Sequence, residues 1–261
     1  MNFPVLPFCR SIIKDFYFKI FTEPCDLSNC IVFKCNGYRV KVLHKRDGKD
    51  FLIFGKYKDK YCIIEQSDEI DDNYHHVMGK NFTEELRTIA GIGISTYHWS
   101  NDNRFCGKCG SILKFSDKEH NAKFCEKCNN TIFPRLNPAI IIAVKKEDSI
   151  LVTRKSEWKG KRYGLVAGFI EYGENIEEAA IREVFEETSI KIKNIKYVAS
   201  QFWPFPYQLM IGLEAEYVSG KIILDEEELA EAKWLKFKYI SEDILPPQSS
   251  IARFLMERFK I

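Results

Sequence analysis

The segment from Gly168 to Ser189 places the strongest constraint on the fold, because a glycine turn leads directly into a helix crowded with carboxylates. Residues 177–190 combine good helix formers with apolar residues and contain neither Gly nor Pro, so they are predicted to be helical. Asn175 stands where the N-cap would be, and Glu177 and Glu178 suit the positive end of the helix dipole. The sequence therefore predicts a turn followed by a negatively charged helix.

Three carboxylates of this helix indicate a metal site. Glu183 and Glu187 are four residues apart and share one helical face, with Glu186 next to that face. Like charges at this spacing repel, so a folded chain that keeps them close usually holds a cation between them. Hard oxygen ligands suit Mg²⁺ or Mn²⁺, ions that keep several waters and bind substrate phosphates. The alternative interpretation is a solvated acidic helix.

The spacing of these residues resembles the Nudix box of the nucleoside diphosphate-X hydrolases. The matching positions are Gly168, Glu174 and the run Arg-Glu-Val-Phe-Glu-Glu-Thr-Ser-Ile that begins at Arg182. One position departs, because the box has Gly where this chain has Ser189. A helix end often needs the left-handed backbone that Gly adopts most easily, so we expect the departure to affect local geometry and not the metal ligands.

Four cysteines form a second metal pattern. Cys106 and Cys109 make one Cys-x-x-Cys knuckle, and after fifteen residues Cys125 and Cys128 make another. Two such knuckles suit a tetrahedral Zn²⁺ site, and since protein fills all four positions the ion is predicted to be structural. A redox role is the weaker alternative, because no thioredoxin-like βαβ pattern surrounds either knuckle.

Composition limits the remaining possibilities. A chain of 261 residues, 45% hydrophobic and 14% aromatic, fits two or three units with real cores. The net charge of +2 gives no broad electrostatic case for nucleic-acid or membrane binding. No stretch could span a bilayer, and residues 1–4 lack a signal-peptide pattern, so we expect a cytoplasmic protein with no membrane partner. Nine cysteines suit a reducing compartment. Those outside the zinc pattern are expected to be small buried hydrophobes: Cys9, Cys25, Cys30, Cys35 and Cys62.

Three parts are predicted along the chain. Residues 1–100 read as a β-rich domain, 101–132 as the zinc ribbon and 133–261 as the Nudix domain. In the first part, apolar runs at 31–33, 40–43, 51–54 and 61–64 predict strands, and polar turns such as 45–49 and 67–73 separate them. A helix is predicted over 82–90, with Thr83 as its cap. His75 and His76 are expected to be solvated, with a metal or phosphate contact as the alternative.

The third part contains the pattern of a mixed sheet with two helices. Strands are predicted at 139–144, 149–153, 163–166, 195–202, 208–218 and 233–236, and a terminal helix at 249–259. The expected fold class is α+β. The Nudix resemblance implies an α/β/α sandwich with a mixed sheet, preceded by a zinc ribbon and a β-rich N-terminal domain.

An aromatic segment narrows the substrate. Residues 200–210, Ser-Gln-Phe-Trp-Pro-Phe-Pro-Tyr-Gln-Leu-Met, resemble the Ser-Gln-Pro-Trp-Pro-Phe-Pro-x-Ser motif of the NADH pyrophosphatases among the Nudix enzymes. Prolines stiffen the aromatic residues into a flat wall that suits a planar base, and an aromatic edge of the core is the alternative. Phe202 replaces the first Pro of the motif and Gln208 its Ser. The predicted substrate-binding residues are Ser200, Gln201, Phe202, Trp203, Pro204, Phe205, Pro206, Tyr207 and Gln208.

The resemblance covers the chain from Cys106 onward and implies five further roles. Glu228, in an acidic loop, corresponds to an additional metal ligand, and Ala167 to a residue whose carbonyl binds metal. Phe169 corresponds to a ring that stacks on nicotinamide. Phe133 replaces a Tyr that reaches the same nicotinamide across a homodimer, which keeps the stacking face but loses the hydroxyl. Ala252 corresponds to a substrate-contacting alanine.

The predicted reaction is metal-assisted hydrolysis of the pyrophosphate bond of NADH or NAD, giving nicotinamide mononucleotide and AMP. Mg²⁺ or Mn²⁺ held by Glu183, Glu187 and Glu228, with Glu186 assisting, would activate water and neutralise the diphosphate. Glu187 is the predicted base, Glu186 is the second choice, and Arg182 is expected to orient the carboxylates. An NAD-capped RNA end presents the same bond.

Three alternatives stay open at this point. A Nudix enzyme could act on ADP-ribose or nucleotide sugars instead, and only a substrate panel separates these. A zinc-ribbon nucleic-acid-binding regulator on a Nudix scaffold is the second, and the intact carboxylates argue against it. A dehydrogenase-type NAD binder is the third, and the lack of Gly-x-Gly-x-x-Gly after a strand counts against it.

Overall fold

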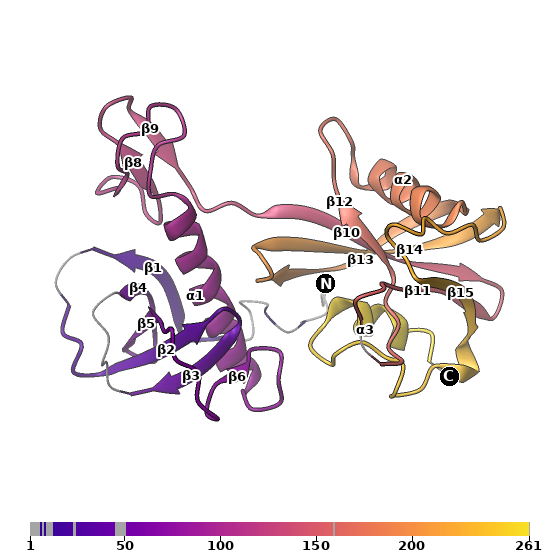
Figure 1. Cartoon of the computed structure of the whole chain (residues 1–261), viewed down its shortest axis with the longest axis horizontal. Helices are drawn as coiled ribbons and strands as arrows, with labels where there is room; N and C mark the ends of the chain where they lie inside the picture. The colour runs from indigo at the N-terminus through magenta and orange to yellow at the C-terminus, as the bar shows by residue number, and fades with distance from the viewer. Residues whose placement is uncertain are drawn as a thin grey trace. The chain divides into compact units, whose positions relative to one another are not determined.

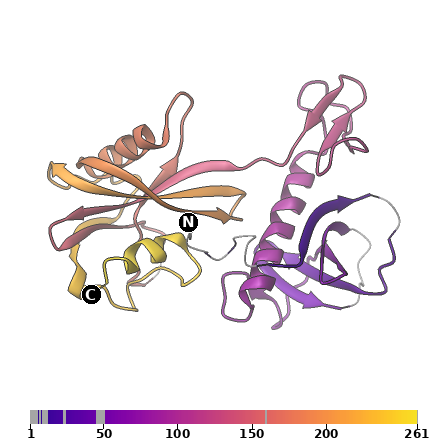
Figure 2. The same ribbon diagram turned by 180° about the vertical axis from the view of Figure 1, so that it is seen from behind.

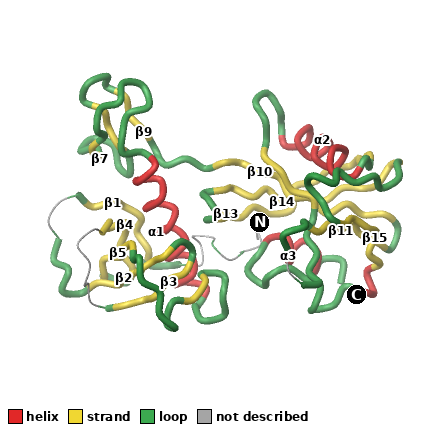
Figure 3. The backbone as a smooth tube through the Cα atoms, in the orientation of Figure 1, coloured by secondary structure: helices red, strands yellow, loops and turns green. Residues whose placement is uncertain are grey.

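The computed structural model describes residues 6, 8, 13–22, 25–44, 51–158 and 160–260. It divides the chain into two compact units. The N-terminal unit contains residues 8–136 together with the short segment Pro204–Tyr207, and the C-terminal unit is built mainly from residues 137–203 and 208–261. Figure 3 shows that strands dominate the regular structure, with few helices. The predicted boundaries at residues 100 and 132 stay a prediction.

The N-terminal unit is built on a six-stranded sheet. Its order is β1 (Phe16–Phe21), β4 (Phe51–Tyr57), β5 (Lys60–Gln66), β2 (Cys30–Asn36), β3 (Arg39–Leu43) and β6 (His75–His76). β2 and β5 run parallel, whereas the other neighbours are antiparallel. Four of these strands are the apolar runs of the sequence, and buried Val32, Ile53 and Ile63 form a core cluster between them. The turn predicted at 45–49 lies outside the described residues.

A long helix, α1 (Glu84–Asp102), packs on this sheet (Figure 1). Thr83 caps it as predicted, because its side chain accepts a hydrogen bond from the Leu86 amide. The predicted end at residue 90 was wrong, since the helix continues through two glycines. At Gly93 an added Cβ would come 2.8 Å from the Phe54 ring, so the missing side chain lets helix and sheet approach closely. This contact offsets the roughly 1 kcal/mol that glycine costs a helix.

The zinc-ribbon region is a small three-stranded sheet within the N-terminal unit. Its strands are β7 (Lys114–Phe115), β8 (Lys123–Cys125) and β9 (Asn130–Ile132). Gly110 and Asn129 each follow a Cys-x-x-Cys knuckle and have positive φ of 71° and 51°. Residues that tolerate the left-handed region therefore occupy the two turns that present the thiols.

The C-terminal unit contains a mixed sheet, as predicted. Its order is β13 (Lys191–Trp203), β14 (Gln208–Ser219), β10 (Asn137–Lys146), β11 (Ser149–Arg154) and β15 (Glu231–Lys236), with β12 (Val166–Phe169) also paired to β10. Only β10 and β14 are parallel among the pairs of this sheet. The strand predicted at 163–166 was misplaced, because Tyr163 instead donates its amide to the Ile244 carbonyl and pairing with β10 begins at Val166.

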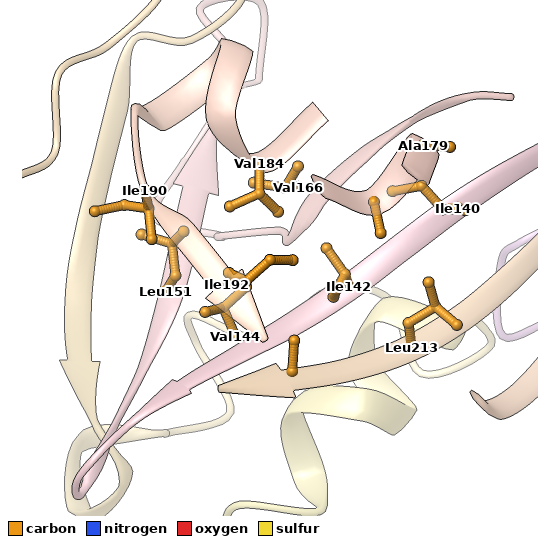
Figure 4. Packing of buried hydrophobic residues seen from close by; sticks show 12 residues of the cluster. Ile140, Ile142, Val144, Leu151, Val166, Ala179, Val184, Ile190, Ile192 and Leu213 are labelled. Carbon is orange, nitrogen blue, oxygen red and sulfur yellow. The ribbon is translucent and has the colours of Figure 1, made fainter. Parts of the chain in front are cut away.

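Two helices complete this unit. α2 (Ile176–Thr188) and α3 (Ile251–Glu257) lie on opposite sides of the sheet in both views (Figures 1 and 2). Val184 of α2 packs with Val166, Ile140 and Leu213 of the strands, as Figure 4 shows. This arrangement is the expected α/β/α sandwich. In the described part of the chain no helix is both long and apolar enough to cross a membrane.

Candidate active site

The start of α2 is fixed by a capping box. Asn175 Oδ1 accepts a hydrogen bond of 2.8 Å from the Glu178 amide, and Glu178 Oε2 accepts one of 2.9 Å from the Asn175 amide. Both contacts satisfy amides that a helix start leaves without intrahelical partners. The predicted N-cap is confirmed, and α2 therefore begins at a defined distance from the glycine turn.

α2 ends just before Ser189, the position where the Nudix box has Gly, and Ser189 has the left-handed backbone expected there. Ser189 has φ of 58° and ψ of 21°, and its amide donates to the Phe185 carbonyl over 2.7 Å. The backbone thus keeps the geometry that Gly would adopt without strain. The positions of the carboxylates on α2 are unaffected, because they precede this residue.

Arg182 ties the carboxylates to the preceding loop. Its guanidinium makes two hydrogen bonds to Glu174, of 2.6 and 2.9 Å. It also donates to Glu183 over 2.8 Å, to Glu186 over 3.0 Å and to the Phe169 carbonyl over 2.9 Å. Hydrogen bonds from Arg182 lower the pKa of Glu174 to about 2. This planar fork holds several side chains in one arrangement, as the sequence predicted for Arg182.

Gly168 lies directly against the Glu183 carboxylate. An added Cβ would come 2.0 Å from the carboxyl carbon of Glu183, so any side chain at this position would displace that carboxylate. Burial is the largest cause of the raised pKa of Glu183, and the hydrogen bond from Arg182 acts in the opposite direction. The glycine of the turn therefore makes room for one of the predicted metal ligands.

Glu187 is the buried carboxylate of the site. It is 5% exposed, and burial raises its pKa to about 8. Among the described residues, no hydrogen bond or ion pair reaches its carboxylate. The charges that act on it come from Lys155, Glu183, Glu228 and Asp225. A buried acidic group without a donor and close to other carboxylates is the environment that a divalent cation would stabilise.

Backbone contacts bring the acidic loop to this helix. The Ile223 amide donates to the Thr188 carbonyl over 3.1 Å, and the Asp225 amide to the Glu187 carbonyl over 3.2 Å. Glu228 follows in the next turn, and Lys155 Nζ lies 3.4 Å from its Oε2. Sequence reasoning missed Lys155 and Asp225. One signal could have pointed to Lys155: it directly follows β11, the strand that was predicted at 149–153. β11 pairs with β15, the strand that follows the acidic loop.

Side chains of the aromatic segment fall in different environments. Gln201 is buried, donates to the Ser249 carbonyl over 2.9 Å and accepts from the Ile251 amide over 2.8 Å. Its amide thus fixes the start of α3, beside Ala252. Ser200 accepts a hydrogen bond from Tyr197 over 3.2 Å. Three neighbours are half-buried, namely Phe202, Trp203 and Gln208.

The tip of the segment packs inside the N-terminal unit. The Phe205 ring lies 4.6 Å from Tyr38, edge to face, and 5.9 Å from His76, stacked. The Tyr207 hydroxyl donates to Asp102. The predicted substrate contacts of this tip, which also contains Pro204 and Pro206, stay predictions. His76 takes part in this packing but stays exposed, and its Nδ1 accepts a hydrogen bond from the Met78 amide over 3.1 Å. The expected loop pair was wrong in one respect, because His75 and His76 form the short strand β6 and His75 is half-buried.

The remaining predicted positions are placed within their own units. Phe169, on β12, and Phe133, after β9, are 50% and 54% exposed, so each ring has a face available for a planar group. Ala167 pairs with Ile141 on β10. Ala252 is half-buried in the first turn of α3.

The four predicted zinc ligands form one cluster. The Sγ atoms of Cys106 and Cys128 are 3.5 Å apart, as are those of Cys109 and Cys125. A tetrahedral zinc–thiolate site places its sulfurs about 3.8 Å from one another, so the donor set fits Zn²⁺. The other described cysteines form no disulfide among the described residues, and they are buried except for half-buried Cys25: Cys25, Cys30, Cys35 and Cys62. Cys9 lies outside the described residues.

Comparisons with known proteins agree with this geometry. Residues 134–255 match the NUDIX domain family model. Over 172 residues the chain is 42% identical to proteins named NAD-capped RNA hydrolase NudC from Salmonella typhi and from Salmonella heidelberg strain SL476. Each match covers 66% of this chain and 66% of the relative, so the matched region spans about two thirds of those proteins.

A solved structure supports the fold alone. The NUDIX hydrolase from Nitrosomonas europaea superimposes with a TM-score of 0.51 at 20% sequence identity, covering 60% of this chain and 90% of that protein. Nudix hydrolases use divalent metal ions, and the cysteine cluster described above can bind zinc. The box geometry, the family model and the relatives lead to one assignment: the chain belongs to the Nudix family, with its Nudix domain in residues 134–255.

Proposed function

We propose that this protein hydrolyses the pyrophosphate bond of NADH or NAD and releases nicotinamide mononucleotide and AMP. The observation that carries the proposal is the convergence of Glu183, Glu187 and Glu228 at the second half of α2. Relatives at 42% identity are named NAD-capped RNA hydrolases, and this name supports extending the proposal to NAD caps on RNA, which contain the same bond.

The residues present fit a catalytic Mg²⁺ or Mn²⁺ site. Glu183, Glu187 and Glu228 would hold the ions, assisted by Glu186 and the Ala167 carbonyl. The buried Glu187 carboxylate, which no described donor reaches, supports this assignment. A bound ion of this kind neutralises a diphosphate and lowers the pKa of coordinated water.

The side chains of the protein then have separate roles in the reaction. Glu187 would orient the attacking water and take its proton, because it is the most buried carboxylate of the site and burial raises its pKa to about 8. Glu186 is the second choice as base; its side chain is 56% exposed and is bound by Arg182. Arg182 would act only through the carboxylates that it holds in place.

The proposal extends to the surroundings of the reaction. Phe169 would stack on the nicotinamide, and Phe133 of a second copy would cover its other face in a homodimer. The cysteine cluster would hold one structural Zn²⁺. The described cysteines form no disulfides, which supports a reducing, cytoplasmic location.

A substrate panel tests the proposal. Purified protein is given NADH, NAD, ADP-ribose and NAD-capped RNA, each with Mg²⁺ or Mn²⁺, and the products are separated by chromatography. We expect AMP and nicotinamide mononucleotide from NADH. Glu187→Gln keeps the size of the side chain but removes its charge and basic oxygen, so turnover should fall at least about 10²-fold. Turnover above about a tenth of the wild-type value would contradict the role of Glu187.

A further inference from the structure

We infer that the loop between β11 and β12 is a contact surface for the RNA strand that follows an NAD cap. This loop, called the basic loop below, comprises residues 155–158 and 160–163 in the described part of the chain. The inference rests on the proposed function, because it concerns the RNA-linked form of the same substrate. NADH carries no RNA strand, so its hydrolysis would not need this loop.

The basic loop starts at the carboxylate site and is fixed at both ends. At its start, Lys155 Nζ lies 3.4 Å from Glu228. At its end, the Tyr163 amide donates to the Ile244 carbonyl over 2.9 Å, and its hydroxyl donates to Glu231 over 2.9 Å. In an NAD-capped RNA the strand continues from the adenosine that is joined to the diphosphate, so it would start close to this loop.

The middle of the basic loop offers positive charge to solvent. Lys161 and Arg162 are both exposed, and neither forms an ion pair within 4 Å of a described carboxylate, although the charge of Lys161 acts on Asp243 at longer range. Nearby Arg154 and Lys233, in contrast, are both paired with Glu231. The two loop cations are thus available for phosphate oxygens, which supply most of the affinity of proteins for nucleic acids.

The same loop also contains an exposed aromatic ring. Trp158 is 39% exposed, and its amide donates to the Lys155 carbonyl over 3.2 Å. Its ring also covers Gly164, where an added Cβ would come 2.6 Å from Cη2. The packing on Gly164 holds the indole in place while part of its surface stays accessible. Fixed aromatic rings beside basic side chains are how proteins stack and track single-stranded RNA.

Charge reversal at the middle of the loop tests the inference. The double variant Lys161→Glu/Arg162→Glu is compared with Lys191→Glu/Lys193→Glu, which makes the same change of charge at exposed positions of β13. Binding of an uncapped single-stranded RNA is measured by fluorescence anisotropy at several salt concentrations. We expect the loop variant to weaken binding about ten-fold and to reduce the salt slope by about 1.4, for two lost phosphate contacts. The β13 variant should stay near wild type.

Hydrolysis kinetics on the same proteins complete the test. The loop variant should raise the KM for NAD-capped RNA and leave the KM for NADH within about two-fold. Trp158→Ala should weaken RNA binding about ten-fold. Trp158→Tyr should retain most of the binding, because a tyrosine ring can stack on a base as a tryptophan ring can. Equal losses in the loop and β13 variants, an equal effect on NADH, or no RNA binding by the wild type would overturn the inference. If NADH is not hydrolysed at all but the loop variant still loses RNA binding, the proposed function fails and the contact surface stands.

Discussion

At the scale of single residues, Ser189 holds a conformation that its side chain disfavours. Its φ of 58° is left-handed, which costs an L-residue about 1 kcal/mol. Ser189→Gly should therefore raise the free energy of unfolding by roughly 0.5 kcal/mol, since the greater flexibility of Gly in the unfolded chain cancels part of the gain. Urea denaturation measures the change. Ser156→Gly, at an exposed residue without positive φ, is the control and should not stabilise. A destabilised Ser189→Gly variant would show that the serine side chain supports the helix end.

The raised pKa of Glu187 makes stability depend on pH. Burial raises this pKa from 4.5 to about 8. Between these values the folded protein keeps a proton that the unfolded chain has lost, so the stability of the metal-free protein falls as the pH rises. Glu187→Gln is neutral throughout and lacks this effect. In the presence of a chelator, the Tm of the wild type should fall relative to that of the variant between pH 4.5 and 8. Parallel curves would contradict the assignment.

Two further points define that pH experiment. Glu174 has the opposite shift, with a pKa lowered to about 2 by Arg182, so its contribution is lost only as the pH falls below 4.5. It therefore lies outside the measured window. Added Mg²⁺ should stabilise the wild type more at pH 8 than at pH 6, because metal binding requires the ionised carboxylate.

At the scale of elements, the sequence predicted those features that depend on contacts between residues close together in the chain. α2 has its capping residue, its periodicity and its charges within one short segment, and the structure confirms its start. The helix ends at Thr188, two residues before the predicted end, because Ser189 turns left-handed. The end of α1 could not be predicted, since the fit of Gly93 against Phe54 joins residues far apart in the sequence. Lys155 was missed because its contact with Glu228 also joins residues far apart in the sequence. The packing of Phe205 on Tyr38 likewise depends on tertiary structure that no motif encodes.

The zinc ribbon leads to a prediction at this same scale. Four clustered thiols should bind about one Zn²⁺ per chain, which elemental analysis measures. Cys106→Ser should abolish the bound zinc and lower the Tm, and affect hydrolysis only through that loss of stability. Cys62→Ala is the matched control, because it removes a buried thiol outside the cluster and should keep the zinc. Zinc-free wild-type protein, or iron in its place, would contradict a structural zinc site.

At the scale of the whole molecule, the proposed dimer concerns how the nicotinamide is held. Phe133 and Phe169 are both about half exposed, so each ring has a face on which a planar base could stack. Each ring stacked on the base would contribute about 0.5–1.5 kcal/mol beyond burial. Phe133→Ala should therefore raise the KM for NADH about ten-fold and that for ADP-ribose less, because ADP-ribose lacks the nicotinamide. Phe169→Ala should show the same selectivity.

The control and the oligomeric state decide how that result is interpreted. Phe105→Ala removes another exposed ring of the N-terminal unit and should leave both KM values unchanged. Sedimentation should report a dimer, since Phe133 is proposed to act on the substrate of a second copy. A monomer with full NADH activity would exclude this arrangement. Equal impairment of NADH and ADP-ribose hydrolysis by Phe133→Ala would show that the ring contributes to the site as a whole and does not recognise the nicotinamide.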